Sequence, residues 1–198
     1  MNRRDNEELR RRQLIEAAIA TIGKLGFARA SLGEIAGRAG VSPGLVAHYF
    51  SDKAGLLEAT LRLLTEELSS AMVERFRHCE GAEARIAAIV DSCLSYEQHD
   101  PELAAVWLAF WAEAAHSPTL GRVQRIYQRR LADNLTHAVR ELVRPGEARR
   151  VAEMIACLID GAWIRATLNR DGPQARQTRA LVMEGVDAIL AATRMEAA

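Results

Sequence analysis

Two tryptophans and a carboxylate are the residues of this chain whose types and spacing favour recognition of a cation. Trp107 and Trp111 lie in the segment AVWLAFWAEA with Phe110 between them, so that in a helix the three rings share one side. Asp160 precedes Trp163 in the apolar segment ACLIDGAWIRATL. Aromatic faces and a carboxylate together bind quaternary ammonium groups, with cation–π attraction of about 0.5 to 2 kcal/mol per ring.

The same residues also have a purely structural interpretation. Aromatic side chains at helical spacing often form a core, and a carboxylate in an apolar segment needs a cationic partner or remains costly to bury. Arg129, Arg130 and Arg165 are possible partners for Asp160. The spacing alone leaves both interpretations open.

The chain lacks several common catalytic and metal-binding patterns. It contains no G-x-G-x-x-G, G-x-x-x-x-G-K-[ST] or H-E-x-x-H sequence, and its five histidines show no ligand spacing. Cys79, Cys93 and Cys157 form no Cys-x-x-Cys pair, which favours small core residues over a disulfide framework or a zinc site. We therefore expect no enzyme activity, no catalytic residues, no metal and no cofactor.

A second group of residues, between positions 31 and 53, predicts DNA binding. Ser31 begins a short helix as part of a capping box, and Gly40 ends it. Ser42 can cap a second helix, with Pro43 at its first position, where the missing N–H costs nothing. Two short helices joined by a glycine turn are typical of a helix-turn-helix motif, whose second helix enters the major groove of DNA.

The second helix of this motif has an inner face, with Val46 and Phe50, and an outer face that meets DNA. We expect Gly44, Leu45 and Ala47 to approach the bases, through thymine methyl groups, backbone contact and DNA shape. Phosphates are expected at the helix N-termini at Ser31 and Ser42. The side chains of His48, Tyr49 and Lys53 are also expected to hold phosphates. The complete predicted set is Ser31, Ser42, Pro43, Gly44, Leu45, Ala47, His48, Tyr49 and Lys53.

Charge is distributed unevenly along the chain. The net charge of the 198 residues is zero, yet residues 1–53 contain nine Lys and Arg against six Asp and Glu. Such a split suits a module that meets phosphate. The arginines near the start either contact phosphate or form a solvated helix start; they are Arg3, Arg4, Arg10, Arg11 and Arg12.

The N-terminal sequence MNRRDNEELRRRQ is too polar for a signal peptide, and no apolar run approaches the roughly 20 residues that span a bilayer. We therefore expect a cytoplasmic protein that does not bind membranes.

Glycine and proline residues divide the chain into about nine helices, and no alternating run of β-branched residues indicates a sheet. An all-α fold is predicted, with a helix-turn-helix DNA-binding domain at residues 1–55 and a helical ligand-sensing and dimerisation domain at 56–198. The predicted helices are 8–25, 31–39, 42–49, 52–78, 82–98, 101–115, 118–143, 146–169 and 174–194. The fourth runs from one domain into the other and would couple them.

One recognition helix reads few base pairs, so we expect a homodimer on palindromic double-stranded operator DNA. The last two helices carry apolar residues that would form a four-helix interface, although packing within one monomer is the competing use. These residues are Ala152, Ile155, Ala156, Ile159, Leu181, Val182, Val186 and Ile189.

Residues Leu14 to Ala59, with IAGRAGVSPGLVAHYFSDKAGLLEA at their centre, resemble the DNA-binding domain of TetR-type transcriptional regulators. In those proteins a Tyr-Phe pair and a lysine close the motif, as Tyr49, Phe50 and Lys53 do here. From about Arg12 to Leu168, the segments HYFSDKAGLLEATLR, WLAFWA, RRLADNL and LIDGAWIRATL resemble the choline-responsive, BetI-type repressors of glycine betaine synthesis.

This resemblance implies a dimeric repressor of choline-uptake and betaine-synthesis genes, acting in osmotic stress and released from its operator by choline. Together with the spacing above, it predicts a choline site formed by Trp107, Phe110, Trp111, Glu113, Tyr127, Asp160 and Trp163. The alternative is a TetR-type regulator of the same fold that senses another small hydrophobic or cationic metabolite. Leu45, Ala47 and Glu113 depart from the family pattern, so operator and ligand are less determined than the class.

Overall fold

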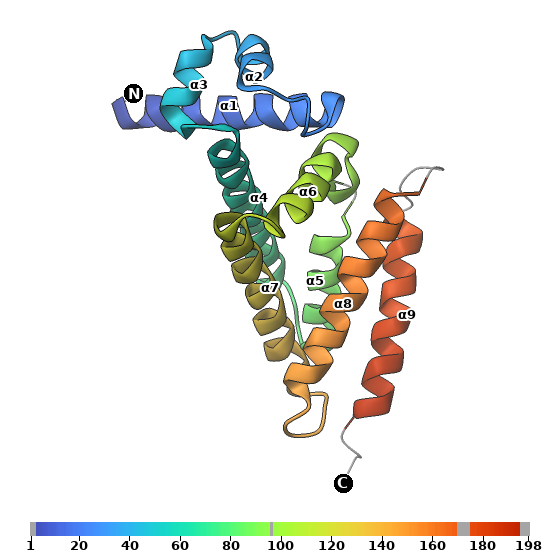
Figure 1. Cartoon of the computed structure of the whole chain (residues 1–198). Coiled ribbons are helices and arrows are strands. Elements are labelled where there is room, and N and C mark those ends of the chain that lie inside the picture. Colours follow the sequence, from blue (N-terminus) through green and yellow to red (C-terminus); the bar gives the residue numbers. More distant parts are fainter. Residues whose placement is uncertain (1–2, 96, 170–174, 195–198) are drawn as a thin grey trace. The chain divides into compact units, whose positions relative to one another are not determined.

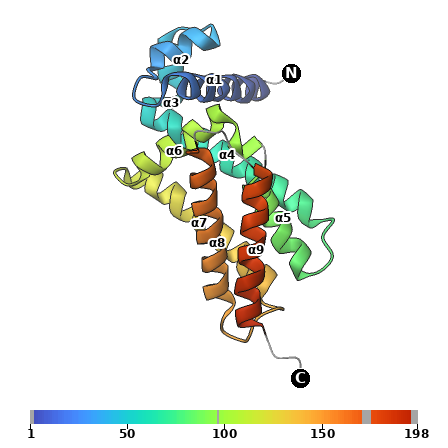
Figure 2. The same cartoon turned by 90° about the vertical axis from the view of Figure 1, so that its right-hand side faces the viewer.

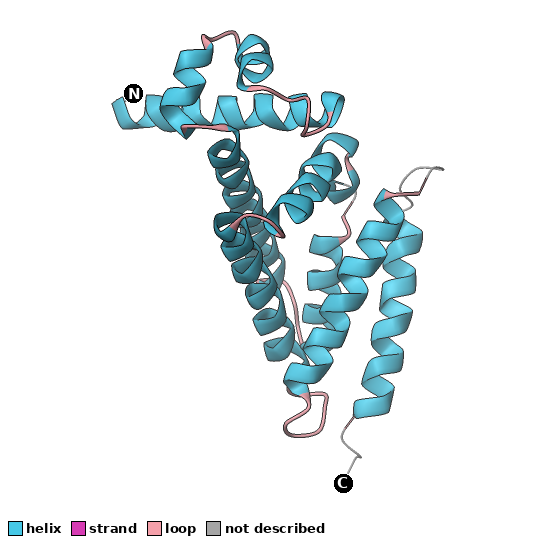
Figure 3. Ribbon diagram, viewed as in Figure 1, coloured by secondary structure: helices cyan, strands magenta, loops and turns pink. Residues whose placement is uncertain are grey.

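The computed structural model describes residues 3–95, 97–169 and 175–194, in which the regular elements are helices (Figure 3). They are α1 (Arg3–Leu25), α2 (Leu32–Ala39), α3 (Pro43–Phe50), α4 (Lys53–Phe76), α5 (Ala82–Cys93), the 3-10 turn η1 (Glu97–His99), α6 (Pro101–Ala114), α7 (Pro118–Val139), α8 (Ala148–Thr167) and α9 (Ala175–Thr193). Val143 and Arg194 form an isolated antiparallel bridge, and these ranges contain no strand. The all-α prediction is confirmed.

Three predicted helix ends are wrong by several residues. α1 begins at Arg3 rather than at residue 8; residues 5–13 are all exposed, so no buried apolar stripe marks this start in the sequence. α5 ends at Cys93 rather than at residue 98, and η1 follows it. α7 ends at Val139 rather than at 143, since the chain turns there towards the bridge to Arg194.

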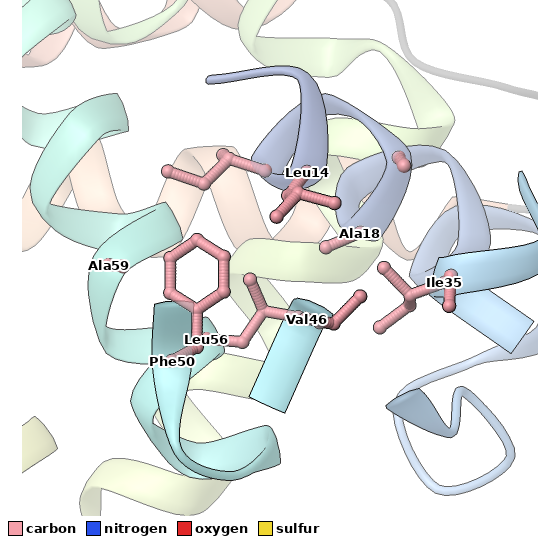
Figure 4. Close-up of a cluster of buried hydrophobic side chains, with 10 residues drawn as sticks. Leu14, Ala18, Ile35, Val46, Phe50, Leu56 and Ala59 are labelled. Atoms are coloured by element: carbon pink, nitrogen blue, oxygen red, sulfur yellow. The ribbon is translucent and has the colours of Figure 1, made fainter. Parts of the chain in front are cut away.

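One compact unit, unit 1, consists of Met1–Thr65 and Asp100–Gln124. In it α2 and α3 pack on α1 (Figure 1). Their shared core is drawn in Figure 4 and includes Leu14, Ala18, Ile35, Val46, Phe50, Leu56 and Ala59. α6 also packs on α1, so closely that a Cβ on Gly23 would lie 2.5 Å from Cα of Glu102. Glycine is required at this approach.

The second compact unit, unit 2, consists of Glu66–His99 and Arg125–Ala198. α8 and α9 run side by side in both views (Figures 1 and 2). A Cβ on Gly185 would lie 2.5 Å from a methyl carbon of Leu158, so a larger residue there would require the Leu158 side chain to move. Arg179 of α9 forms an ion pair with Asp91 of α5, and Arg194, directly after α9, pairs with Glu83 of α5 at 3.0 Å.

The predicted domain boundary after residue 55 falls in the first turn of α4. The two compact units do not coincide with the predicted domains, because α6 belongs to the same unit as the helix-turn-helix. The functional division into residues 1–55 and 56–198 therefore stays a prediction.

Candidate functional site

The helix-turn-helix begins with two serine caps. The Ser31 hydroxyl accepts from the Glu34 N–H at 3.1 Å at the start of α2, and the Ser42 hydroxyl accepts from the Leu45 N–H at 3.3 Å at the start of α3. Gly40 ends α2 with φ +67°, a left-handed conformation that glycine adopts without strain. Both predicted caps and the glycine turn are confirmed.

Residues 40–44 also spell G-x-S-x-G, which in α/β hydrolases presents a nucleophilic serine between a strand and a helix. Here the serine lies between two helices, and its hydroxyl caps the second of them. The surroundings of Ser42 therefore match a helix cap and not a nucleophile.

The outer face of α3 contains the residues that were expected at DNA. Val46 and Phe50 are buried in the unit 1 core, as predicted. Pro43, Gly44 and His48 are exposed, whereas Leu45, Ala47 and Tyr49 are half-buried. The His48 and Tyr49 rings meet edge to face with centroids 5.7 Å apart. The helix therefore offers small and apolar groups at its start and two hydrogen-bonding rings near its end.

A groove between α3 and the first half of α1 was not anticipated. It is lined by Asn6, Glu7, Leu9, Arg10, Gln13, Leu45, His48 and Tyr49. Arg10 and Gln13 are joined by a side-chain hydrogen bond of 3.1 Å, and the neighbouring Arg11 guanidinium lies 4.9 Å from the centre of the Phe50 ring. The helical spacing of Asn6, Arg10 and Gln13 could have indicated this common face.

The end of α3 is held close to the start of α4. Ser51 has φ +63°, and the Asp52 carboxylate accepts from the Gly55 N–H at 2.7 Å. A Cβ on Gly55 would collide with the Phe50 carbonyl oxygen, so only glycine fits. This short turn leaves α3 little freedom relative to α4.

Lys53 was expected to hold a DNA phosphate, but its ammonium contacts the protein itself. Nζ donates to the carbonyl oxygen of Phe27 and to that of Ala28, the second at 3.3 Å, and lies 4.1 Å from the centre of the Phe27 ring. Partial burial lowers the pKa of Lys53, and the charge of Glu113 opposes that shift.

α6 carries four of the predicted ligand residues, all in unit 1. Trp107 and Phe110 are buried, with ring centroids 6.1 Å apart, and Trp111 and Glu113 are half-buried. Glu113 interacts electrostatically with Lys53. Its charge is therefore partly compensated within the protein.

The other three predicted ligand residues lie in unit 2, where the structure brings Tyr127 and Asp160 together with Cys93. The Tyr127 hydroxyl and the Cys93 thiol form a hydrogen bond, and burial raises the pKa of Cys93 to about 12 and that of Tyr127 well above its usual value. Asp160 is half-buried, and loss of solvent raises its pKa to about 6.

None of the three candidate arginines forms an ion pair with Asp160 in the described ranges; Arg129 instead pairs with Asp133 at 3.8 Å. Trp163 is buried and its indole Nε1 donates to the Gln98 carbonyl oxygen at 2.9 Å, which fixes the ring. Cys93 is the member of this cluster that the sequence did not indicate, because nothing in its local sequence distinguishes it from a core cysteine.

The predicted interface residues of α8 and α9 are mostly core. Seven of the eight are buried or half-buried, because α8 and α9 pack on each other and on α5. Leu181 is the exception, with 62% of its surface exposed. The exposed face of this helix pair consists of other residues, among them Met154, Cys157 and Gly161 on α8 and Ala188 on α9.

Across the part of the chain that the structure describes, no helix is long and apolar enough to cross a membrane, and no group of three or more His, Cys, Asp or Glu could hold a metal ion. The three cysteines are free thiols.

Two family models match this chain. Residues 14–60 match the model of bacterial regulatory proteins of the tetR family, and residues 82–191 match the C-terminal model of BetI-type transcriptional repressors.

Individual proteins agree with these matches. The chain is 40% identical over 187 residues to the HTH-type transcriptional regulator BetI 2 of Chromohalobacter salexigens, covering 93% of this chain and 90% of that protein. It is 44% identical over 165 residues to the BetI regulator of Cronobacter sakazakii, covering 82% of each. A regulator of Saccharomonospora viridis, crystallised with choline, has a similar fold at 21% identity, with a TM-score of 0.81 over 89% of this chain and 95% of that one.

Proposed function

Because the chain belongs to the BetI-type transcriptional repressors of the TetR family, we propose that it represses genes for choline uptake and glycine betaine synthesis. These family members are DNA-binding regulators and not enzymes. Choline is proposed to release the chain from its operator. The observation that carries the ligand assignment is Asp160, a half-buried carboxylate beside Tyr127 without a cationic partner in the described ranges.

On the DNA side, we assign base contact to the start of α3 and phosphate contact to its flanks. Gly44, Leu45 and Ala47 offer few hydrogen-bonding groups, so thymine methyl contact and DNA shape carry much of the specificity. The N-termini of α2 and α3 present backbone N–H groups to phosphate, and His48 with Tyr49 adds side-chain donors.

On the ligand side, the charge of Asp160 selects a cation. Its pKa of about 6 leaves it mostly ionised at neutral pH despite the cost of burial. A quaternary ammonium group suits this environment, because it neutralises the carboxylate without needing hydrogen-bond acceptors, and aromatic faces attract it. Trp163, whose ring is fixed by Gln98, supplies such a face in the same unit.

Of the two carboxylates predicted to balance the ligand charge, Asp160 is favoured over Glu113. The Glu113 charge interacts with Lys53, whereas burial raises the pKa of Asp160. The expectation that Trp107 and Trp111 also contribute to choline binding stays a prediction, which Trp111→Leu tests by removing the ring and keeping apolar bulk.

Dimerisation is proposed through the exposed face of α8 and α9. This face combines an exposed Leu181 with Met154 and with the small residues Gly161 and Ala188, which permit close approach of another helix pair. Two copies joined there would present two recognition helices to a palindromic operator in the cytoplasm.

The ligand assignment is tested by calorimetric titration with choline and with 3,3-dimethylbutan-1-ol, its neutral carbon isostere. We expect saturable binding of choline and at least about tenfold weaker binding of the isostere, since only choline gains the Asp160 attraction. Asp160→Asn should reduce this preference to the part that the aromatic face supplies, while the exposed control Asp187→Asn should keep it in full. Equal binding of both compounds by the native chain would contradict the assignment.

A further inference from the structure

Three contacts of one side chain join the corner between α1 and α2 to the start of α4. The Lys53 ammonium donates to two successive carbonyl groups, of Phe27 and Ala28, and lies over the Phe27 ring. Phe27 and Ala28 belong to the connection between α1 and α2, and Lys53 is the first residue of α4. All three residues lie in unit 1.

We propose that Lys53 is a positioning residue for DNA binding: its ammonium holds the α1–α2 corner against the first turn of α4 and thereby fixes the direction in which α3 is presented. The inference rests on the DNA-binding role proposed above. It replaces the expectation that this lysine mainly holds a phosphate.

The donor geometry of the ammonium supports this role. A lysine ammonium has three N–H donors and no acceptor, and two carbonyl oxygens and an aromatic face already surround this one. With two donors on carbonyl groups, at most one N–H of Lys53 remains for a phosphate. The Glu113 carboxylate of α6 adds a negative charge within unit 1 that favours the ammonium in this position.

The position of Lys53 in the chain explains why its contacts affect α3. α3 ends at Phe50, and the close approach of Gly55 to the Phe50 carbonyl leaves no slack between α3 and α4. α2 is tied to α3 by the Gly40 turn, where the Val41 N–H donates to the Ala36 carbonyl at 3.0 Å. Lys53 adds the third connection, because it joins α4 to the segment that leads into α2.

The test measures binding of two duplexes as a function of salt, by fluorescence anisotropy. One duplex is recovered from a random-sequence pool by the native chain, and the other is a mixed-sequence duplex of the same length. For Lys53→Ala we expect about tenfold weaker binding of the recovered duplex at every salt concentration, with an unchanged slope of log Kd against log salt. Binding of the mixed-sequence duplex should change less than about twofold.

Rescue distinguishes positioning from simple loss of packing. Lys53→Arg keeps a cation and N–H donors and should restore most of the specific affinity, whereas Lys53→Met keeps the apolar stem and should not. Lys24→Ala removes the other lysine, at an exposed position of α1, as a control for charge. Circular dichroism confirms that each variant is folded; if Lys53→Ala is not, Phe27→Leu replaces it and should weaken specific binding about threefold.

A phosphate role gives a different result, in which Lys53→Ala lowers the salt slope by about 0.9 and weakens both duplexes equally. That result would overturn the inference, as would native-like specific binding by the folded Lys53→Ala and Lys53→Met variants. If the native chain recovers no duplex at all, the proposed DNA-binding function fails instead.

Discussion

Polar groups find partners in different ways in the DNA-binding corner, which comprises residues 31–53, and in the Asp160 cluster of Cys93, Tyr127 and Asp160. In the corner, the hydroxyls of Ser31 and Ser42 cap helices and the ammonium of Lys53 is surrounded by carbonyl groups and a ring. In the cluster, Asp160 is half-buried, lacks an ion pair within the described ranges and has its pKa raised by burial to about 6.

This difference assigns the two regions different tasks. A polar group with its partners in place stabilises one arrangement, as a DNA-reading surface requires. A carboxylate whose charge is not compensated gains the most free energy from an incoming cation, because the cost of its burial is already present. The corner is therefore suited to hold a shape and the cluster to respond to a ligand.

The largest effect is expected when the hydrophobic core that supports α2 and α3 is disrupted. Phe50 is 5% exposed and packs between α3 and the start of α4. We expect Phe50→Ala to lower the free energy of unfolding by about 3 to 5 kcal/mol and to abolish operator binding. Urea unfolding followed by circular dichroism measures the loss, and Val73→Ala, at a position 56% exposed, should stay within about 0.5 kcal/mol of the native chain.

A second change tests whether DNA binding by the α2–α3 region depends on dimerisation. Leu181→Glu places a charge on the proposed α8–α9 face and should weaken dimerisation about 100-fold, since burying an unpaired carboxylate is costly. Sedimentation velocity should then show monomers that keep native helicity but bind a palindromic duplex weakly. Val73→Glu adds the same charge on α4 as a control, and a Leu181→Glu chain that still sediments as a dimer would contradict this interface.

The pH dependence of choline binding sharpens the comparison. With a folded pKa of about 6, Asp160 is mostly neutral at pH 5 and mostly ionised at pH 7.5. Choline affinity should therefore fall about tenfold between pH 7.5 and pH 5. Since the folded pKa is raised from 3.8 to about 6, the burial penalty of the ionised group is full above pH 6 and is lost progressively as the pH falls from 6 to 3.8.

Titration calorimetry at several pH values measures this effect. Asp160→Asn should make the residual choline affinity independent of pH in this range. An unchanged pH dependence in that variant would mean that another group controls binding.

The smallest effect expected is the loss of one cap. Ser42→Ala removes the acceptor for the Leu45 N–H and should lower the free energy of unfolding by about 1 kcal/mol. Ser70→Ala, at an exposed position within α4, should have a much smaller effect. Thermal unfolding of the two variants compares them directly, and equal losses would show that the cap contributes nothing specific.

The two regions also differed in how far the sequence revealed them. The limits of α2 and α3 were predicted to within one residue, because Ser31, Gly40, Ser42 and Pro43 act through bonds to residues only a few positions away. The contacts of Lys53 with Phe27 could not be predicted in this way, since the two residues are 26 positions apart and meet only in the folded chain.

The same limitation applied to the ligand residues. Their spacing on α6 was correct for a helix, but nothing in it showed that Phe110 is fully buried or that Glu113 interacts with Lys53. The proximity of Cys93 and Asp160 likewise arises from the packing of α5 and α8. The polar first turns of α1 were missed because residues 5–13 are exposed and form no buried apolar stripe.

The central claim is that choline and operator DNA compete through one protein equilibrium. Its most direct test measures operator affinity with and without saturating choline, and choline affinity with and without saturating operator. The account predicts that each ligand weakens the other by the same factor, about 5- to 150-fold. Choline that binds the native chain and leaves its operator affinity unchanged would contradict it.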